Sequence, residues 1–220
     1  LDNNIKNINS TPNDVKNFAT IIKCDVTNQT NVKKVFQIIC KKLGGIDILI
    51  SNAGAPWQGN IGNVSNSILK KSFDLNFFAH QYLSQESIKV MLKQNTKGIL
   101  LYNISKQSVD PGINFGPYGL PKASTLFLMR QYTLEYGKYG IRANGVNADR
   151  IKSGIVTNKL ISIRAKARGV NKKNYMQNNL LKEEVFALDV AEAFLNLAKA
   201  KKTTGNIMTV DGGNMSAILR

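Results

Sequence analysis

The sequence Tyr118-Gly119-Leu120-Pro121-Lys122 is the stretch around which the chain is organised. Tyr118 and Lys122 are four positions apart, so on a helix they lie on one face, one turn apart. A lysine ammonium beside a phenol favours the phenolate and is expected to lower the tyrosine pKa from about 10 toward neutral pH. A phenol tuned in this way passes a proton to or from a substrate hydroxyl or carbonyl. The alternative is an amphipathic tyrosine beside a solvated lysine.

Ser105 lies upstream of this pair, at the end of a predicted strand. Residues 98–102 are largely apolar and follow the polar residues 93–97, a pattern typical of a buried strand. Residues 107–117 contain Pro111 and Gly112 and are interpreted as a loop that leads into a helix over 118–136. We expect this loop to bring Ser105 close to Tyr118, where both side chains can bind one substrate oxygen.

Two further polar positions accompany predicted elements. Asn52, Ala53 and Gly54 follow residues 46–50, whose apolar character predicts a parallel strand buried on both faces. Small residues there allow the backbone to approach a cofactor, or else they form only a turn. Residues 65–94 predict one or two helices broken near Asn76, because an asparagine among apolar neighbours is inconsistent with a plain core helix. A satisfied core amide is the alternative.

Together, Asn76, Ser105, Tyr118 and Lys122 resemble the catalytic tetrad of the short-chain dehydrogenase/reductase family. The resemblance extends from about Thr20 to the C-terminus. It implies an α/β fold with a Rossmann-like, doubly wound parallel sheet in three layers. It also implies hydride transfer between NAD, with NADP not excluded, and a small alcohol or aldehyde.

The same resemblance implies a role for each member of the tetrad. Tyr118 is the general acid/base, and Lys122 lowers its pKa and holds the nicotinamide ribose. Ser105 orients the substrate oxygen. Asn76 holds a water that links the lysine to solvent.

Further cofactor-binding residues follow from the resemblance. Asp25 and Val26 end a strand next to the adenine ring, although Asp25 also suits a loop acid that caps the next helix. Asn52, Ala53 and Gly54 form a wall of the cofactor site. Ile151 and Ser153 match a family loop that closes over the nicotinamide. Ala148 and Asp149 stand where that loop usually has Pro-Gly, and Asp149 with Arg150 forms either a local ion pair or substrate contacts.

Three stretches narrow the resemblance: residues 115–122, 144–151 and 203–206. They are similar to the C-terminal dehydrogenase half of bifunctional rhamnulose-1-phosphate aldolase/alcohol dehydrogenases. This implies an aldolase domain fused upstream, lactaldehyde as the substrate, and a role in rhamnose- or fucose-type sugar catabolism. Residues 154–179, rich in charge and asparagine, are expected to form a mobile substrate lid.

The start of a dinucleotide fold is missing from the sequence. No glycine-rich turn that would open a phosphate-binding helix occurs before Asp25. Residues 18–22 predict a strand, but the polar residues before them leave no room for a βαβ unit. We therefore expect residues 1–220 to be an N-terminally truncated, partial domain with exposed apolar sheet edges. The alternative is a non-catalytic remnant that cannot bind the dinucleotide by itself.

Composition favours a single basic domain. Thirty Lys and Arg against fourteen Asp and Glu give a net charge of +16. The lysines occur as scattered pairs rather than one stripe, so we expect solvated helix faces and no nucleic-acid partner. No apolar run reaches the roughly 20 residues that span a bilayer, so no membrane partner is expected.

Two cysteines and one histidine, His80, make a disulfide framework or a metal site improbable and suit a reducing, cytoplasmic location. His80 is interpreted as a packing residue.

The helical segments 65–94 and 118–136 carry more apolar positions than one sheet face covers. Examples are Phe77, Phe78, Phe127, Met129 and Tyr132. Because the family pairs these helices between subunits, we expect a symmetric homo-oligomer.

Overall fold

A parallel sheet forms the middle of the molecule. The computed structural model describes residues 1–2, 13–152 and 156–214. Over these residues the strand order is β1-β2-β3-β4, with every neighbouring pair parallel. The strands are β1 (Ile48–Ser51), β2 (Ile99–Asn103), β3 (Arg142–Ala148) and β4 (Ile207–Val210).

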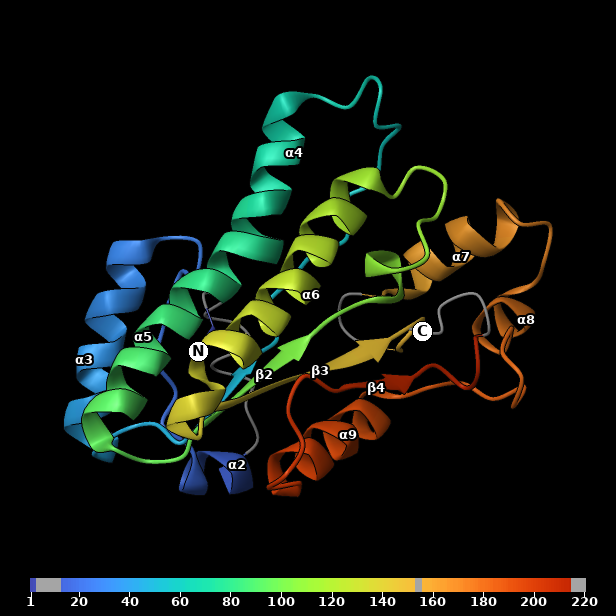
Figure 1. Ribbon diagram of the computed structural model, residues 1–220. Helices are drawn as coiled ribbons and strands as arrows, with labels where there is room; N and C mark the ends of the chain where they lie inside the picture. The colour runs from blue at the N-terminus through green and yellow to red at the C-terminus, as the bar shows by residue number, and fades with distance from the viewer. Residues whose placement is uncertain (3–12, 153–155, 215–220) are drawn as a thin grey trace.

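Helices cover both faces of this sheet (Figure 1). The α-helices are α2 (Asn13–Phe18), α3 (Gln29–Leu43), α4 (Asn66–Phe73), α5 (Ala79–Gln94), α6 (Gly116–Tyr136), α7 (Asn158–Lys166), α8 (Lys172–Met176) and α9 (Ala187–Lys199). Short 3₁₀ turns are η2 (Lys106–Ser108) and η3 (Gly137–Tyr139), and a π-helical turn, η1 (Asp74–Phe78), joins α4 to α5. No helix in the described ranges is long and apolar enough to cross a bilayer.

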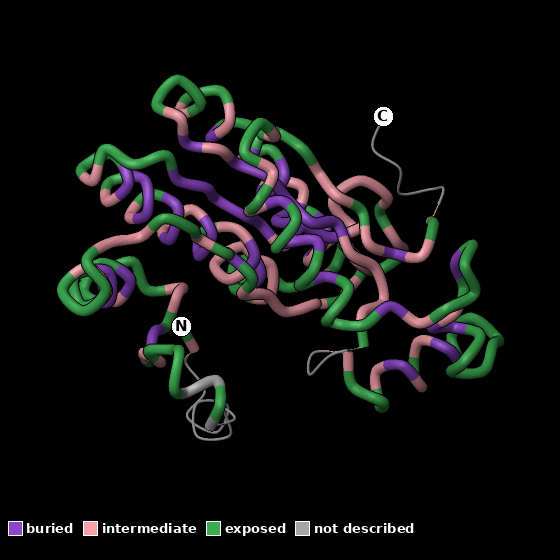
Figure 2. Tube along the Cα trace, turned by 90° about the horizontal axis from the view of Figure 1, so that it is seen from below, coloured by how far each residue is buried: buried purple, intermediate pink, exposed green. Residues whose placement is uncertain are grey.

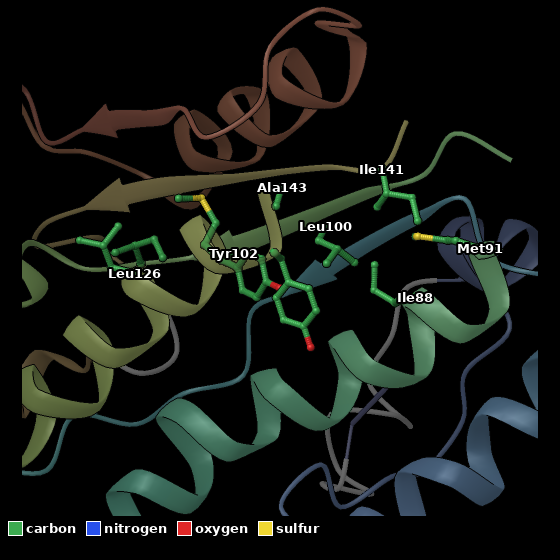
Figure 3. Close-up of a cluster of buried hydrophobic side chains, with 10 residues drawn as sticks. Ile88, Met91, Leu100, Tyr102, Leu126, Ile141 and Ala143 are labelled. Atoms are coloured by element: carbon green, nitrogen blue, oxygen red, sulfur yellow. The ribbon is translucent and has the colours of Figure 1, made fainter. Parts of the chain in front are cut away.

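Alternation along β2 separates the two main cores. Leu100 and Tyr102 point to the face covered by α5 and α6, where they join Met91 and Leu126 (Figure 3). Ile99 and Leu101 point to the other face, where they pack with the apolar side of α9. Figure 2 shows the buried segments running through the middle of the molecule with exposed segments around them. The predicted three-layer α/β fold is therefore confirmed.

Most predicted elements are present close to their predicted bounds. The helix predicted over 118–136 is α6, and the strand predicted over 98–102 is β2. The long helix predicted to break near Asn76 is α4–η1–α5, with the π turn centred on that residue. A π turn contains an extra residue relative to an α-helix and often occurs at functional sites.

The strand predicted over 46–50 differs from expectation. It forms as β1, but Ile48 and Ile50 are 51% and 50% exposed rather than buried on both faces. The reason is that β1 pairs only with β2, so it is an edge strand in the described sheet. An apolar run therefore predicts a strand, but it does not predict whether another strand or a helix covers that strand.

Two other predictions are wrong. The strand predicted over 18–22 does not form: Phe18 ends α2, and among the described residues the pairing near this segment is a single bridge between Asp2 and Lys23. A strand needs a neighbour for its backbone groups, and no named strand of the described chain pairs with this segment. Met129 and Tyr132 are not surplus apolar residues, because both are buried in the core beneath α6.

Arg142 connects the beginning of β3 to the end of α9. Its guanidinium donates hydrogen bonds to main-chain carbonyls of Leu197, Ala198, Ala200 and Thr203. The last carbonyls of a helix have no intrahelical partners, so this arginine satisfies the C-terminus of α9 and the turn that follows it. Burial lowers the pKa of Arg142 from its usual value.

Candidate active site

Tyr118 and Ser105 meet at the carboxyl end of β2. The Ser105 hydroxyl lies near enough to the Tyr118 phenol to lower its pKa. Ser105 begins the η2 turn, where its Oγ also accepts a hydrogen bond from the Gln107 N–H at 3.3 Å. Gly119 permits the close approach of α6 to this turn, because a Cβ there would lie 3.0 Å from the Gln107 carbonyl oxygen. The structure therefore brings together the two side chains expected to share a substrate oxygen.

The Tyr118 pKa differs from the sequence-based expectation. Burial raises it above the usual value for a tyrosine, and the nearby Asp149 carboxylate raises it further. The nearby Ser105 hydroxyl and the positive charge of Arg164 lower it in part. Lys122 is not among the groups that shift it, although its Nζ lies 5.9 Å from the centroid of the Tyr118 ring. The expectation that the lysine lowers this pKa toward neutrality is wrong for this structure, because desolvation outweighs the charges.

Lys122 is almost completely buried beneath the site. Its side chain is 2% exposed and donates a hydrogen bond from Nζ to the Asn103 carbonyl at 2.8 Å. Removal from water disfavours the charged ammonium, which lowers the pKa of Lys122 to about 8. The lysine therefore loses and regains its proton close to physiological pH.

Asn76 holds the segment after β1 in place. Its Oδ1 accepts a hydrogen bond from the Ala55 N–H at 3.1 Å, and its Nδ2 donates to the Ala55 carbonyl at 3.0 Å. The Nδ2 also donates to Ser72 Oγ at 3.0 Å. The Asn76 main-chain carbonyl accepts a bond of 2.6 Å from Thr125 on α6. These contacts are those of a satisfied core amide, and the relay role implied by the resemblance stays a hypothesis.

Gly54 forms a wall against both Asn76 and Lys122. A Cβ at this position would lie 3.0 Å from Asn76 Oδ1 and 3.5 Å from Lys122 Nζ. Ala53, beside it, is partly buried, whereas Asn52 is exposed and accepts a hydrogen bond from Asn103 Nδ2 at 2.6 Å. The absence of a side chain at Gly54 thus lets the backbone close over the lysine.

The remaining predicted cofactor residues lie at the periphery. Asp25 is exposed and accepts hydrogen bonds from the Thr27 N–H and hydroxyl, whereas α3 is capped by Asn28 rather than by Asp25. Val26 packs in the cluster between α3 and α5. Ile151 packs near α9, and Ser153 falls outside the described residues. The cofactor-binding role of Asp25, Val26 and Ile151 stays a prediction.

Asp149 and Arg150, whose role the sequence left open, form an ion pair. Arg150 Nε lies 3.7 Å from Asp149 Oδ2. His80 is fully buried on α5 and makes a hydrogen bond of 2.6 Å with Ser51, as expected of a packing residue. In the described part of the chain, no group of three or more His, Cys, Asp or Glu side chains is placed to hold a metal ion.

Comparison with known proteins decides the family. A family model described as enoyl-(acyl carrier protein) reductase matches residues 2–215. The chain belongs to the short-chain dehydrogenase/reductase family. This family consists of NAD(P)-dependent oxidoreductases, so a nicotinamide dinucleotide is the cofactor implied for the site.

Several relatives support this membership. The chain is 33% identical over 215 residues to the uncharacterized oxidoreductase YuxG of Bacillus subtilis strain 168, covering 93% of the chain and 31% of YuxG. It is 26% identical over 202 residues to 7alpha-hydroxysteroid dehydrogenase of Escherichia coli K12, covering 91% and 76%. The chain thus spans less than a third of the first relative and about three quarters of the second.

The fold is shared with solved structures of the family. The structure of ElxO with NADP bound superposes with a TM-score of 0.79 at 22% identity, covering 90% of this chain and 78% of that one. At this identity the likeness concerns the fold.

The described residues fit one end of a nicotinamide dinucleotide. Gly54 leaves the backbone close to the Lys122 ammonium, and the Tyr118 ring lies 5.9 Å from that Nζ, so a phenol and an ammonium are available to the hydroxyls of a ribose. No glycine-rich turn between a strand and a helix precedes Asp25 in the sequence, so we identify no group in the described chain that would hold the diphosphate. The fit is therefore to the nicotinamide end alone.

Sequence reasoning missed two features of the site. It did not assign the Asn103 carbonyl, because a main-chain acceptor carries no residue signature. It also missed Arg164, which lies within the lid segment and acts on Tyr118 from α7. Nothing distinguishes this arginine from the other basic residues of that segment in sequence alone.

Proposed function

We propose that this chain carries the catalytic groups of an oxidoreductase that moves hydride between a nicotinamide cofactor and a small alcohol or carbonyl compound. The observation that supports this most directly is that the Ser105 hydroxyl acts on the Tyr118 phenol next to a buried Lys122, which the Asn103 carbonyl holds. A bound nicotinamide supplies or accepts the hydride. The proposal therefore needs the protein only to position the substrate and to move one proton.

The residues divide this work as follows. Ser105 and Tyr118 together bind the substrate oxygen, and the phenol of Tyr118 exchanges the proton with it. Lys122, held by the Asn103 carbonyl, presents its ammonium to the cofactor ribose. Asn76 fixes the Ala53–Ala55 wall through Ala55 and, as a proposal, takes part in the proton relay. Asp25, Val26, Asn52, Ile151 and Ser153 remain proposed cofactor contacts.

For the whole protein we propose a longer chain with an aldolase domain, as in rhamnulose-1-phosphate aldolase/alcohol dehydrogenases, with lactaldehyde as a candidate substrate. The match to less than a third of YuxG agrees with an additional domain. On this proposal residues 1–220 are part of a short-chain dehydrogenase domain whose diphosphate-binding turn lies outside the sequence. We also propose a cytoplasmic location, in agreement with the two free cysteines, Cys24 and Cys40.

A homo-oligomer is part of the same proposal. A groove of about 660 Å³ lies between α5 and α6, lined by residues such as Gln85, Leu128 and Tyr132. Beside it, Phe127 is 67% exposed and lines a second hollow with Phe77. The apolar surface around Phe127 and Phe77 is typical of subunit contacts.

The test makes two measurements, each on residues 1–220 and on the full protein encoded by the longest reading frame that contains them. Formation of reduced nicotinamide is followed spectroscopically with lactaldehyde, or with its reduced diol, as substrate. Calorimetry then measures NAD and NADP binding. We expect turnover from the longer protein and weak dinucleotide binding by residues 1–220 alone. Tight, stoichiometric binding by residues 1–220 would mean that the phosphates are held elsewhere than we infer. Absence of turnover in the longer protein favours the alternative, a non-catalytic remnant.

A further inference from the structure

Arg164 is a partly buried cation, and two of its guanidinium nitrogens have no acceptor in the described protein. It lies near the end of α7, and its Nε and Nη2 atoms are shielded from solvent without a hydrogen-bond partner. An N–H group buried in this way costs free energy, and a charged donor costs more than a neutral one. Such a group in a folded protein is explained most simply by a ligand that accepts its hydrogen bonds.

The surroundings of Arg164 direct it toward the reacting groups. Its guanidinium lies 4.9 Å from the centroid of the Phe115 ring, at the residue that precedes α6 and only three positions before Tyr118. Figure 1 shows α7 beside the loop that leads into α6. The charge of Arg164 also stabilises the phenolate of Tyr118, which places the guanidinium within electrostatic reach of that hydroxyl. The arginine therefore borders the space where a substrate oxygen would lie.

Neighbouring charged groups are engaged elsewhere. The Asp149 carboxylate pairs with Arg150 and accepts a hydrogen bond of 3.5 Å from Asn214. Arg150 and Arg168 both stack on the Tyr175 ring, at 5.2 and 5.3 Å from its centroid. Across residues 1–2, 13–152 and 156–214, no carboxylate lies within ion-pair distance of Arg164. Its counter-ion is thus not supplied by the described protein.

The two shielded nitrogens define the kind of ligand. The Nε–H and the adjacent Nη2–H of a guanidinium are parallel and lie along one edge. This edge matches two oxygens of one carboxylate or phosphate, which it binds through two parallel hydrogen bonds. A neutral hydroxyl or aldehyde oxygen satisfies only one of these donors.

We propose that Arg164 binds a carboxylate or phosphate group of the substrate while the reacting hydroxyl or carbonyl lies at Ser105 and Tyr118. This inference rests on the proposed function and narrows its substrate class to small anionic hydroxy or keto compounds. Lactaldehyde has no anionic group and on this inference is the poorer substrate. The arginine is then a specificity-determining residue, and Tyr118 keeps the proton transfer.

The experiment compares ligands that differ only in charge. Calorimetry measures how tightly two pairs of ligands bind to the protein encoded by the longest reading frame, in the presence of the dinucleotide. One pair is lactate and lactamide, and the other is glycerol 3-phosphate and glycerol. The same pairs are then compared as substrates. We expect one anion of the two pairs to bind roughly 10–100-fold more tightly than its neutral partner, the usual worth of hydrogen bonds to a charged group. A lactate preference indicates a carboxylate substrate, and a glycerol 3-phosphate preference indicates a phosphate ester.

Variants assign the preference to the arginine. Arg164→Gln should abolish it, and Arg164→Lys, which keeps the charge but lacks the parallel donors, should retain only part of it. Lys166→Gln removes an exposed charge from the same helix and should leave the preference intact. Thermal melting of each variant verifies folding. If Arg164→Gln unfolds, the partial loss of anion preference in Arg164→Lys still tests the assignment.

Two results would overturn the inference. One is equal binding of each anion and its neutral partner to the wild type. The other is an anion preference that survives in Arg164→Gln or disappears equally in Lys166→Gln. Failure of the proposed function has a different signature, because calorimetric anion binding needs no turnover. A protein that binds the anion through Arg164 but transfers no hydride keeps this inference and loses the enzyme assignment.

Discussion

The Nζ of Lys122 donates a hydrogen bond of 2.8 Å to the main-chain carbonyl of Asn103. This contact joins the buried face of α6 to the last residue of β2, two positions before Ser105. The hydroxyl of Ser105 and the phenol of Tyr118 are therefore held by the same two elements as the lysine. The relative position of these three side chains therefore depends on how α6 packs against β2 and against the η2 turn that Ser105 begins.

The first prediction concerns the proton carried by Tyr118. Tyr118→Phe removes the hydroxyl and keeps the ring, so turnover of the intact enzyme should fall by about 10²–10⁴-fold, the usual contribution of a positioned proton donor. Folding and dinucleotide binding should hardly change. Steady-state kinetics with Tyr136→Phe as a matched control on the same helix provides the measurement. A Tyr118→Phe enzyme with nearly full activity would end the proposed mechanism.

The second prediction concerns stability and pH. Burial lowers the pKa of Lys122 to about 8 in the folded chain, from 10.5 for a free lysine. Between these two pH values the unfolded chain keeps a proton that the folded chain has lost, so the free energy of unfolding rises with pH. The expected rise is about 3 kcal/mol across this window, relative to a variant without the group.

Chemical denaturation of wild type and Lys122→Met from pH 7 to pH 11 measures this difference. Below pH 8 the buried ammonium costs its full desolvation energy. The free energy of unfolding of Lys122→Met, compared with that of the wild type, should therefore be most favourable there. The exposed Lys93→Met on α5 serves as the control and should run parallel to the wild type. A pH-independent difference between wild type and Lys122→Met would contradict the lowered pKa.

The third prediction concerns the wall held by Asn76. Asn76→Leu keeps the approximate volume but leaves the Ala55 N–H and carbonyl without their partner, at about 1–3 kcal/mol for each buried group. We expect a lower melting temperature and weaker dinucleotide binding by the intact protein. Differential scanning calorimetry and titration calorimetry measure the two effects. Asn66→Leu, at the exposed start of α4, should change neither quantity. An unchanged melting temperature of Asn76→Leu would contradict the inference that Asn76 holds this wall in place.

The fourth prediction concerns assembly. The intact protein should sediment as a symmetric oligomer, and Phe127→Glu should convert it to smaller species, because it places a charge on the exposed face of α6. Leu195→Glu makes the same change on an exposed apolar position of α9, across the sheet, and should leave the oligomer intact. A wild-type protein that sediments strictly as a monomer rules out this interface.

The elements that carry the site were predictable because their signals are local. The helix with Tyr118 and Lys122 follows from its spacing, and the strand before Ser105 follows from its continuous apolar run. The π turn at Asn76 was predictable as a break, since a polar residue there contradicts the helical pattern around it. These features depend on residues within a few positions of one another.

The features that sequence failed to predict depend on distant parts of the chain. Whether Ile48 and Ile50 are covered depends on which strand lies beside β1, and an apolar run does not report this. The raised pKa of Tyr118 results from burial by several elements, whereas the spacing to Lys122 predicted the opposite sign. Arg164 lies 46 positions after Tyr118 by their residue numbers, and only the folded chain places its charge near the phenol.

The contacts of Arg142 have a consequence for how the chain tolerates change. They connect β3 to the end of α9 across 55 to 61 positions and close a long loop that contains α7 and α8. Further bonds from Asn144 to the 203–206 turn close the same loop beside the sheet. A nick or an insertion in the exposed connection between α7 and α8 therefore leaves β3, α9 and β4 attached to one another. On the proposed role of Arg164, exchanging the α7–α8 segment would alter substrate preference while the sheet, Ser105 in the turn after β2 and Tyr118 on α6 stay in place.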